Sequence, residues 1–184
     1  MKKLLLSFVV VCFALTQLVA QEASFSKGDK ALNLGIGFGS TWYSGTYYHS
    51  QVPPISASLE FGVADKILEK GVIGVGPYVG YSSYKWDYSG WGFKYTNIIV
   101  GARGNFHYPL ANKLDTYLGL LIGYNIVSSK EFGTPVGYNY NATSGGIRSA
   151  GYVGARYFFK PSFGIMAELG YGVTYLNVGI TLKF

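Results

Sequence analysis

The last ten residues of the chain are the feature that most limits what it can fold into. Between residues 175 and 184, one set of positions is apolar and the alternate set is polar or small: Leu176, Val178, Ile180, Leu182 and Phe184 against Asn177, Gly179, Thr181 and Lys183. Successive side chains of a strand point to opposite faces, so this segment predicts a strand with one apolar and one polar face. Such a strand separates two different solvents.

The same alternation recurs along the rest of the chain. Together with the last segment it predicts eight strands, over residues 31–40, 55–64, 72–82, 95–108, 115–128, 147–159, 163–171 and 175–184. Pro77 lies inside the third of them and has no N–H to donate, which predicts a bulge or a local break. The pattern is therefore that of an all-β protein.

The connections alternate between long and short. Residues 41–53, 83–94 and 129–146 form the predicted long loops, which are rich in Tyr, Ser and Gly, whereas residues 65–71, 109–114 and 160–162 form short turns. Transmembrane barrels have this asymmetry between their two ends. We therefore predict an eight-stranded antiparallel up-and-down transmembrane β-barrel, with the last strand closing onto the first so that no sheet edge faces lipid.

Composition supports a membrane environment. Hydrophobic residues make up 49% of the chain and charged residues only 13%, against about 25% charged residues in soluble domains. Aromatic residues gather near the ends of the predicted strands, as in interfacial belts. The predicted belts comprise Phe61, Phe106, Tyr108, Tyr157, Phe159, Phe163 and Phe184 at the short-turn end and Tyr43, Tyr81, Trp86, Tyr95 and Tyr124 at the loop end.

The N-terminal residues have the order of a secretory signal peptide. Lys2 and Lys3 precede an apolar run over residues 4–15, and a cleavage site at Leu18-Val19-Ala20 follows, in which Leu18 is larger than the usual residue. We predict a cleaved signal peptide at 1–20, a short N-terminal leader at 21–30 and the barrel at 31–184. The single cysteine, Cys12, lies within the signal, so the exported protein is expected to contain no disulfide.

The C-terminal segment also resembles the assembly signal of bacterial outer-membrane barrels. Asn177, Gly179, Leu182 and Phe184 occupy its polar, glycine, hydrophobic and aromatic positions in order. With the alternation and the loop asymmetry, the chain resembles the OmpA/OmpX-like family of small eight-stranded outer-membrane β-barrels. The resemblance implies a bacterial outer-membrane location, contact with outer-membrane lipid, and recognition of the last strand by the barrel assembly machinery.

The polar face of the predicted strands faces a narrow interior. It is rich in glycine, as the lumen of an eight-stranded barrel requires. Four charged residues share this face: Glu60, Arg103, Arg156 and Glu168. Unpaired buried charges are costly, so we predict that these four form an ion network that fills the lumen.

These features favour a non-enzymatic envelope protein with a packed lumen, whose long loops contact an extracellular ligand or support envelope integrity. A narrow porin-like channel is the first alternative, and it requires a water path past Tyr78, Tyr117 and Tyr152. No cofactor or metal site is predicted. With a net charge of +6 and no basic cluster, nucleic-acid binding has no support.

Two further alternatives remain open. A lipid-A modifying enzyme would use the outer loops, where His49 and Ser50 lie in the first and Asp87 and Ser89 in the second. A soluble lipocalin-like barrel is the structural alternative.

Overall fold

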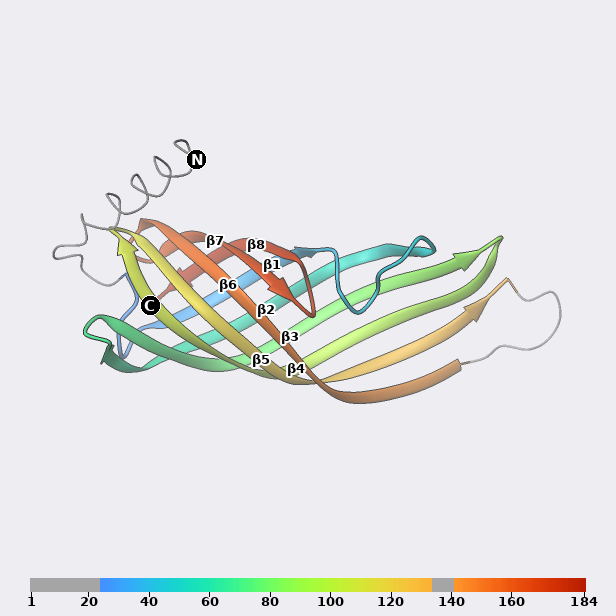
Figure 1. Cartoon of the computed structure of the whole chain (residues 1–184), viewed down its shortest axis with the longest axis horizontal. Coiled ribbons are helices and arrows are strands. Elements are labelled where there is room, and N and C mark those ends of the chain that lie inside the picture. Colours follow the sequence, from blue (N-terminus) through green and yellow to red (C-terminus); the bar gives the residue numbers. More distant parts are fainter. Residues whose placement is uncertain (1–23, 134–140) are drawn as a thin grey trace, which may run out of the picture.

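The computed structural model describes residues 24–133 and 141–184, and these form one closed antiparallel barrel (Figure 1). The predicted signal peptide lies outside the described residues. The strands are β1 (Lys30–Phe38), β2 (Tyr48–Ile67), β3 (Gly71–Tyr88), β4 (Trp91–Ala111), β5 (Leu114–Phe132), β6 (Asn141–Lys160), β7 (Phe163–Tyr171) and β8 (Leu176–Lys183). Each pairs with the next along the chain, and the predicted eight-stranded up-and-down topology is confirmed. The described residues include no helix long and apolar enough to cross a membrane.

Closure is made by β1 and β8. Their register runs from Ala31 opposite Lys183 to Phe38 opposite Leu176. Two backbone hydrogen bonds between Lys30 and Phe184, each 3.0 Å, extend the pairing beyond the ladder. A closed ring satisfies the backbone hydrogen bonds of all its strands, which a sheet in hydrocarbon requires.

The barrel is apolar outside and polar inside. Leu120, Ile122 and Leu169 expose more than 60% of their surface, whereas Asn33 and Asn105 are buried in the interior. From Leu118 to Ile126, both on the outer face, β5 spans roughly 27 Å at about 3.4 Å per residue, or roughly 21 Å of height at a tilt of about 40°. This matches the apolar band of a transmembrane barrel and is the inverse of a lipocalin-like core.

The strands extend further at the loop end than the sequence predicts. The predicted loop at 83–94 is almost entirely strand, because β3 continues to Tyr88 and β4 begins at Trp91. Ser89 and Gly90, with φ of 52° and 87°, form the two-residue turn that suits a tight hairpin. Aromatic residues favour strands, and in this segment their preference outweighs that of Ser and Gly for a loop. The predicted loops at 41–53 and 129–146 likewise lose residues to β2, β5 and β6.

As a result, five strands continue beyond the ring. β1 ends at Phe38, β7 at Tyr171, and β8 begins at Leu176, whereas β2 to β6 run on together (Figure 1). In this protruding part, residues 141–150 of β6 pair with β5 only. We call the continuation the protruding sheet; it comprises residues 48–54, 82–88, 91–97, 125–132 and 141–150.

Pro77 does not produce a bulge. The offset between β2 and β3 is the same on both sides of it, with Ser58 opposite Tyr78 and Phe61 opposite Val75. The ladder with β2 skips Pro77 and Gly76, while Pro77 remains in register with Ala102 of β4. The break expected from the missing N–H is therefore confined to one side of the strand.

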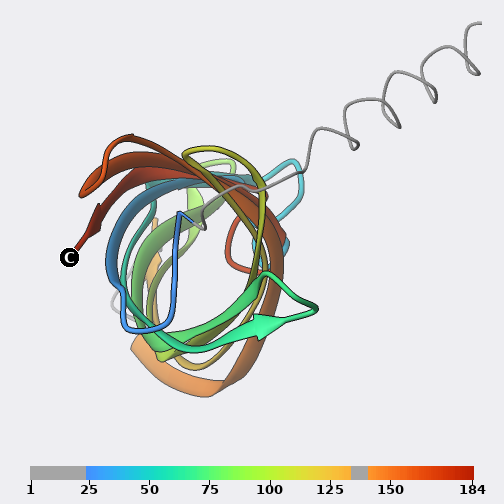
Figure 2. The ribbon, with the colours of Figure 1, turned by 90° about the vertical axis from the view of Figure 1, so that its left-hand side faces the viewer.

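The short-turn end is closed by residues 24–29, which belong to the predicted leader. Gly28 N donates to Gly62 O and Gly62 N donates to Asp29 O, both at 2.9 Å. Lys183 Nζ donates to the Ser24 carbonyl at 2.9 Å. Phe25 is only 1% exposed, and in the view along the barrel this blue segment lies within the outline of the ring (Figure 2).

Candidate functional site: the barrel interior and the aromatic face above it

The half of the lumen nearer the short-turn end contains a cluster of four charged or titratable side chains. The Arg156 guanidinium forms ion pairs with Glu60 and, at 3.4 Å, with Asp115. His107 lies between the same two carboxylates, with Nε2 at 2.6 Å from Glu60 and Nδ1 at 2.8 Å from Asp115. Phe25 covers this cluster, its ring centroid 4.6 Å from that of His107.

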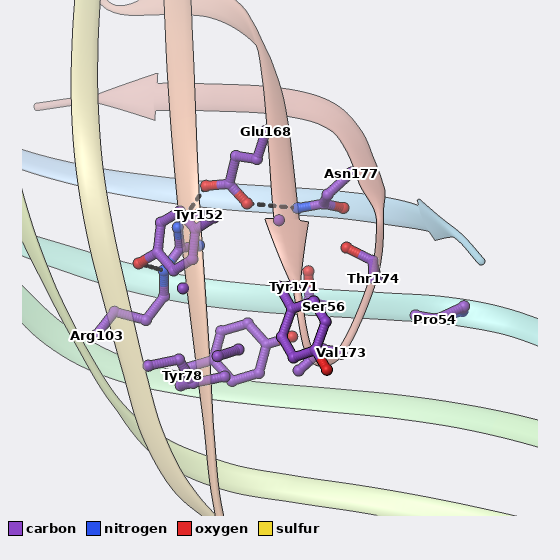
Figure 3. A pocket seen from close by; sticks show the side chains of 14 residues that line it. Pro54, Ser56, Tyr78, Arg103, Tyr152, Glu168, Tyr171, Val173, Thr174 and Asn177 are labelled. Atoms are coloured by element: carbon purple, nitrogen blue, oxygen red, sulfur yellow. Dashed lines mark hydrogen bonds and ion pairs between the residues drawn. The ribbon is translucent and has the colours of Figure 1, made fainter. Parts of the chain in front are cut away.

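A second cluster lies nearer the loop end of the lumen (Figure 3). Arg103 pairs with Glu168 and its Nε donates to the Tyr152 hydroxyl at 2.6 Å. The other donors to Glu168 are the Tyr117 hydroxyl, at 2.8 Å, and Asn177 Nδ2, at 2.9 Å. Three donors thus bind this carboxylate, and they offset the cost of burying its charge.

Asn105 connects the two clusters. Its Nδ2 donates to Glu60 at 2.7 Å, and its Oδ1 accepts from the Tyr152 hydroxyl at 2.7 Å. The result is one hydrogen-bonded network with side chains from six strands, β2 and β4 to β8. The structure pairs the four predicted residues as Glu60 with Arg156 and Arg103 with Glu168.

Sequence reasoning missed several members of this network. Asp115 has the same parity as the inward side chains of β5, and that signal was available because the strand begins beside it. Phe25 could not be found by alternation because it precedes the first strand.

Glycines make room for the large interior side chains. A Cβ at Gly154 would overlap the Tyr117 ring, and a Cβ at Gly119 would overlap the Tyr152 ring. The cavity beside Arg103 and Glu168 has a volume of about 40 Å³, which holds roughly three waters. Apart from this cavity, large side chains occupy the interior at this level of the barrel.

An aromatic face covers the inner side of the protruding sheet and the loop that crosses it. Tyr43 stacks on Tyr84 at 4.5 Å, Tyr43 contacts Tyr95 at 5.5 Å, and Trp86 contacts Trp91 at 5.8 Å. Further ring contacts connect the remaining members. We define the aromatic face as Tyr43, Tyr47, Tyr48, Tyr84, Trp86, Tyr88, Trp91, Phe93 and Tyr95.

The predicted belt at the loop end is therefore wrong for three residues. The Tyr43 hydroxyl donates to the buried Asn97 side chain at 2.9 Å, and burial raises the pKa of this phenol. Trp86 and Tyr95 share the inner parity of their strands with Tyr84 and Asn97. Because the strands continue through the predicted loops, parity directs these rings inward. Other members of the predicted belts, among them Tyr81, Tyr124, Tyr157, Phe159 and Phe163, are exposed.

The structure does not assemble the residues of the enzymatic alternative. His49 lies opposite Lys85, on the outer face, and Ser50 lies opposite the inward Tyr84. Asp87 accepts hydrogen bonds from Lys85 Nζ at 2.7 Å and from Gly90 N at 3.0 Å. These two donors hold the pKa of Asp87 below its ordinary value. His49 and Ser50 thus point to opposite sides of the sheet.

The predicted assembly signal has structural roles in the closed barrel as well. Asn177 binds Glu168 in the lumen. A Cβ at Gly179 would overlap the Leu34 carbonyl oxygen of β1, so glycine permits close approach of the closing strands. Leu182 and Phe184 lie on the exposed side. Recognition of these residues by the assembly machinery stays a prediction.

Comparison with known proteins gives the fold. No protein-family model and no curated protein matches the sequence. Among solved structures, Ail, the attachment invasion locus protein of Yersinia pestis, matches with a TM-score of 0.50 and 14% identity over 86% of this chain and 99% of that one. The N-terminal barrel domain of Pseudomonas aeruginosa OprF (TM-score 0.48, 9% identity, 87% and 100% covered) and a designed transmembrane β-barrel (TM-score 0.46, 18% identity, 87% and 98% covered) are also similar. The likeness to Ail and the closed ring of alternating strands agree, and this chain has the fold of the small eight-stranded outer-membrane β-barrels.

Proposed function

We propose that this protein is a non-enzymatic integral protein of the bacterial outer membrane, with a lumen closed to ions and an external partner bound at the aromatic face. In this proposal residues 1–20 direct export and are removed, and Asn177, Gly179, Leu182 and Phe184 guide assembly. The observation that carries it is the continuous network from Phe25 through Glu60 and Asn105 to Arg103 and Glu168.

The network favours a plug over a pore. A water-filled path through the lumen would expose its charged side chains to water, whereas Arg103, Glu60 and Glu168 are at most 6% exposed and Arg156 is fully buried. Their charges are paired with one another, and such pairs resist separation because a lone buried charge costs several kcal/mol. Phe25 adds an apolar cover at the short-turn end.

The aromatic face favours a binding role. Tyr47, Tyr88 and Trp91 remain 38–54% exposed although they pack against other rings. Tyr and Trp are the residues that most often dominate binding energy at protein interfaces, because they offer large area at low conformational cost. The Trp91 indole donates to Glu131 at 2.8 Å, which holds its ring in place.

Single-channel recording tests the closed lumen. Residues 21–184 are refolded in detergent, checked for altered gel migration without heating, and inserted into a planar bilayer. We expect no openings from the wild type. Steady openings of uniform size from the folded protein would refute the closed lumen and favour the narrow channel.

Mass spectrometry of lipid A tests the absence of enzymatic activity. Lipid A is compared between cells that express the protein, cells that express His49→Ala and cells with neither. We expect one mass distribution in all three. A mass change that requires His49 would make the protein a lipid-A modifying enzyme.

A further inference from the structure

A row of lysines crosses the outer face of the protruding sheet. Lys85 of β3 lies directly opposite Lys94 of β4, which lies directly opposite Lys130 of β5. His49 of β2 continues the row on one side and Asn141 of β6 on the other. We call Lys85, Lys94 and Lys130 the lysine row. It is a consequence of register, so the sequence gives no cluster that reveals it.

Like charges directly opposite one another destabilise a sheet. The repulsion on Lys85 is reduced by its ion pair with Asp87, at 2.7 Å, and by a cation–π contact with the Phe132 ring, whose centroid lies 4.2 Å from Nζ. Lys94 and Lys130 are exposed, and neither ammonium forms an ion pair within residues 24–133 and 141–184. The fold therefore places the positive charges of Lys94 and Lys130 side by side without an acidic partner among the described residues, an arrangement that favours binding of an anion.

The position of the lysine row along the strands, relative to the apolar band, indicates which kind of anion it binds. The last apolar row on the same face is Tyr81, Ile98 and Ile126, in register with one another. Above it lies a row of hydroxyls on the outer face, formed by Thr96, Ser128 and Thr143. Ser83 is in register with Thr96 but is fully buried, and its hydroxyl donates to the Tyr95 carbonyl at 3.1 Å. The lysine row follows directly. Along the outer face, apolar side chains are thus followed by hydroxyls and then by lysines. This order matches the acyl chains of a lipid followed by its polar and anionic headgroup.

The distances agree with this order. Four residues separate Tyr81 from Lys85, or roughly 14 Å along the strand and roughly 10 Å in height at a tilt of about 40°. The headgroup layer is about 5–7 Å thick on each side of a bilayer. Lysine side chains can extend back toward it, with the charge at the headgroup and the stem along the sheet.

We propose that the lysine row binds the phosphate groups of an outer-leaflet lipid headgroup, with Lys94 and Lys130 as the main ligands and the hydroxyl row below them as hydrogen-bonding partners. This rests on the proposed outer-membrane location with the protruding sheet outside. A lipid fits better than a soluble polyanion because the row is continuous with the lipid-facing surface of the same three strands.

The test measures binding of lipid A with two phosphates to the refolded protein in zwitterionic detergent micelles. Each lysine near such a surface contributes about 1 kcal/mol, so we expect the double variant Lys94→Gln/Lys130→Gln to bind roughly 30-fold more weakly. The control, Lys27→Gln/Lys160→Gln, removes the same charge at the opposite end and is expected to change affinity less than twofold. Gel migration without heating verifies the fold of each variant.

Two further arms identify the source of the phosphate. Dephosphorylated lipid A is expected to lose the lysine dependence, and inorganic tripolyphosphate to bind far more weakly than lipid A. The proposal is overturned if the wild type does not bind lipid A, if the double variant binds as tightly as wild type, or if tripolyphosphate binds as tightly as the lipid. The channel recording and the lipid-A mass are separate readouts, so a failure of lipid-A binding is distinguishable from a failure of the proposed function.

Discussion

The pair Arg103 and Glu168 offers the sharpest test of the buried network. Arg103→Met keeps an unbranched apolar stem but leaves Glu168, 6% exposed, with only the neutral donors Tyr117 and Asn177. Breaking a buried ion pair in this way costs about 3–5 kcal/mol. Glu168→Met leaves the buried Arg103 guanidinium without its carboxylate partner and should lower the free energy of unfolding by a similar amount. We therefore expect either single variant to lower the free energy of unfolding by about 3–5 kcal/mol.

The double variant distinguishes a true pair from two independent residues. With both charges removed, two apolar side chains fill the space, and such replacements of buried pairs are often nearly neutral. Some loss persists because Tyr152 and Asn177 lose a partner. We expect a total cost of about 1–3 kcal/mol, well below the sum of the singles.

The assay is a urea titration in detergent micelles, followed by tryptophan fluorescence and by gel migration without heating. As a control, the rim pair Lys183 and Asp29, 3.3 Å apart and partly exposed, should show a coupling energy below about 1 kcal/mol. Additivity of the Arg103 and Glu168 variants within about 0.5 kcal/mol would refute the argument that these charges stabilise the lumen as a pair.

Three further outcomes follow from the packing. Phe25→Ala should lower the free energy of unfolding by about 3 kcal/mol, because the ring is buried over the lumen. It should also release residues 24–29, so that trypsin cleaves after the already exposed Lys27; unchanged stability and resistance to trypsin would mean that residues 24–29 are not a closure. Gly119→Val should prevent folding, as judged by gel migration without heating, because its Cβ would overlap the Tyr152 ring, whereas Gly146→Val, where nothing lies within 4 Å of the added Cβ, should fold; equal behaviour would contradict the packed interior. Lys94→Gln should raise the free energy of unfolding by about 0.2–1 kcal/mol in urea titrations without anionic lipid, because Lys85 and Lys130 lie directly opposite; a loss of stability would contradict the repulsion.

The sequence by itself determined the fold class and the two faces of the barrel. Alternation is a local property, since each strand displays its period of two without reference to its neighbours. Ile122 and Leu169 could therefore be assigned to the outside, and Asn33 to the inside, before any strand pairing was known. Loop asymmetry correctly predicted a long connection between β1 and β2, whereas the predicted long loop between β3 and β4 is the two-residue turn of Ser89 and Gly90.

What only the tertiary structure decided depends on register, which is a property of strand pairs. The pairing of Arg103 on β4 with Glu168 on β7 spans the lumen, and no local pattern specifies it. The lysine row likewise exists only because three strands are aligned residue against residue. Phe25 reaches the interior through a segment without strand periodicity. Alternation predicts whether a residue faces the lumen or the outside of the barrel. Only the pairing and register of the strands determine which residues lie opposite one another.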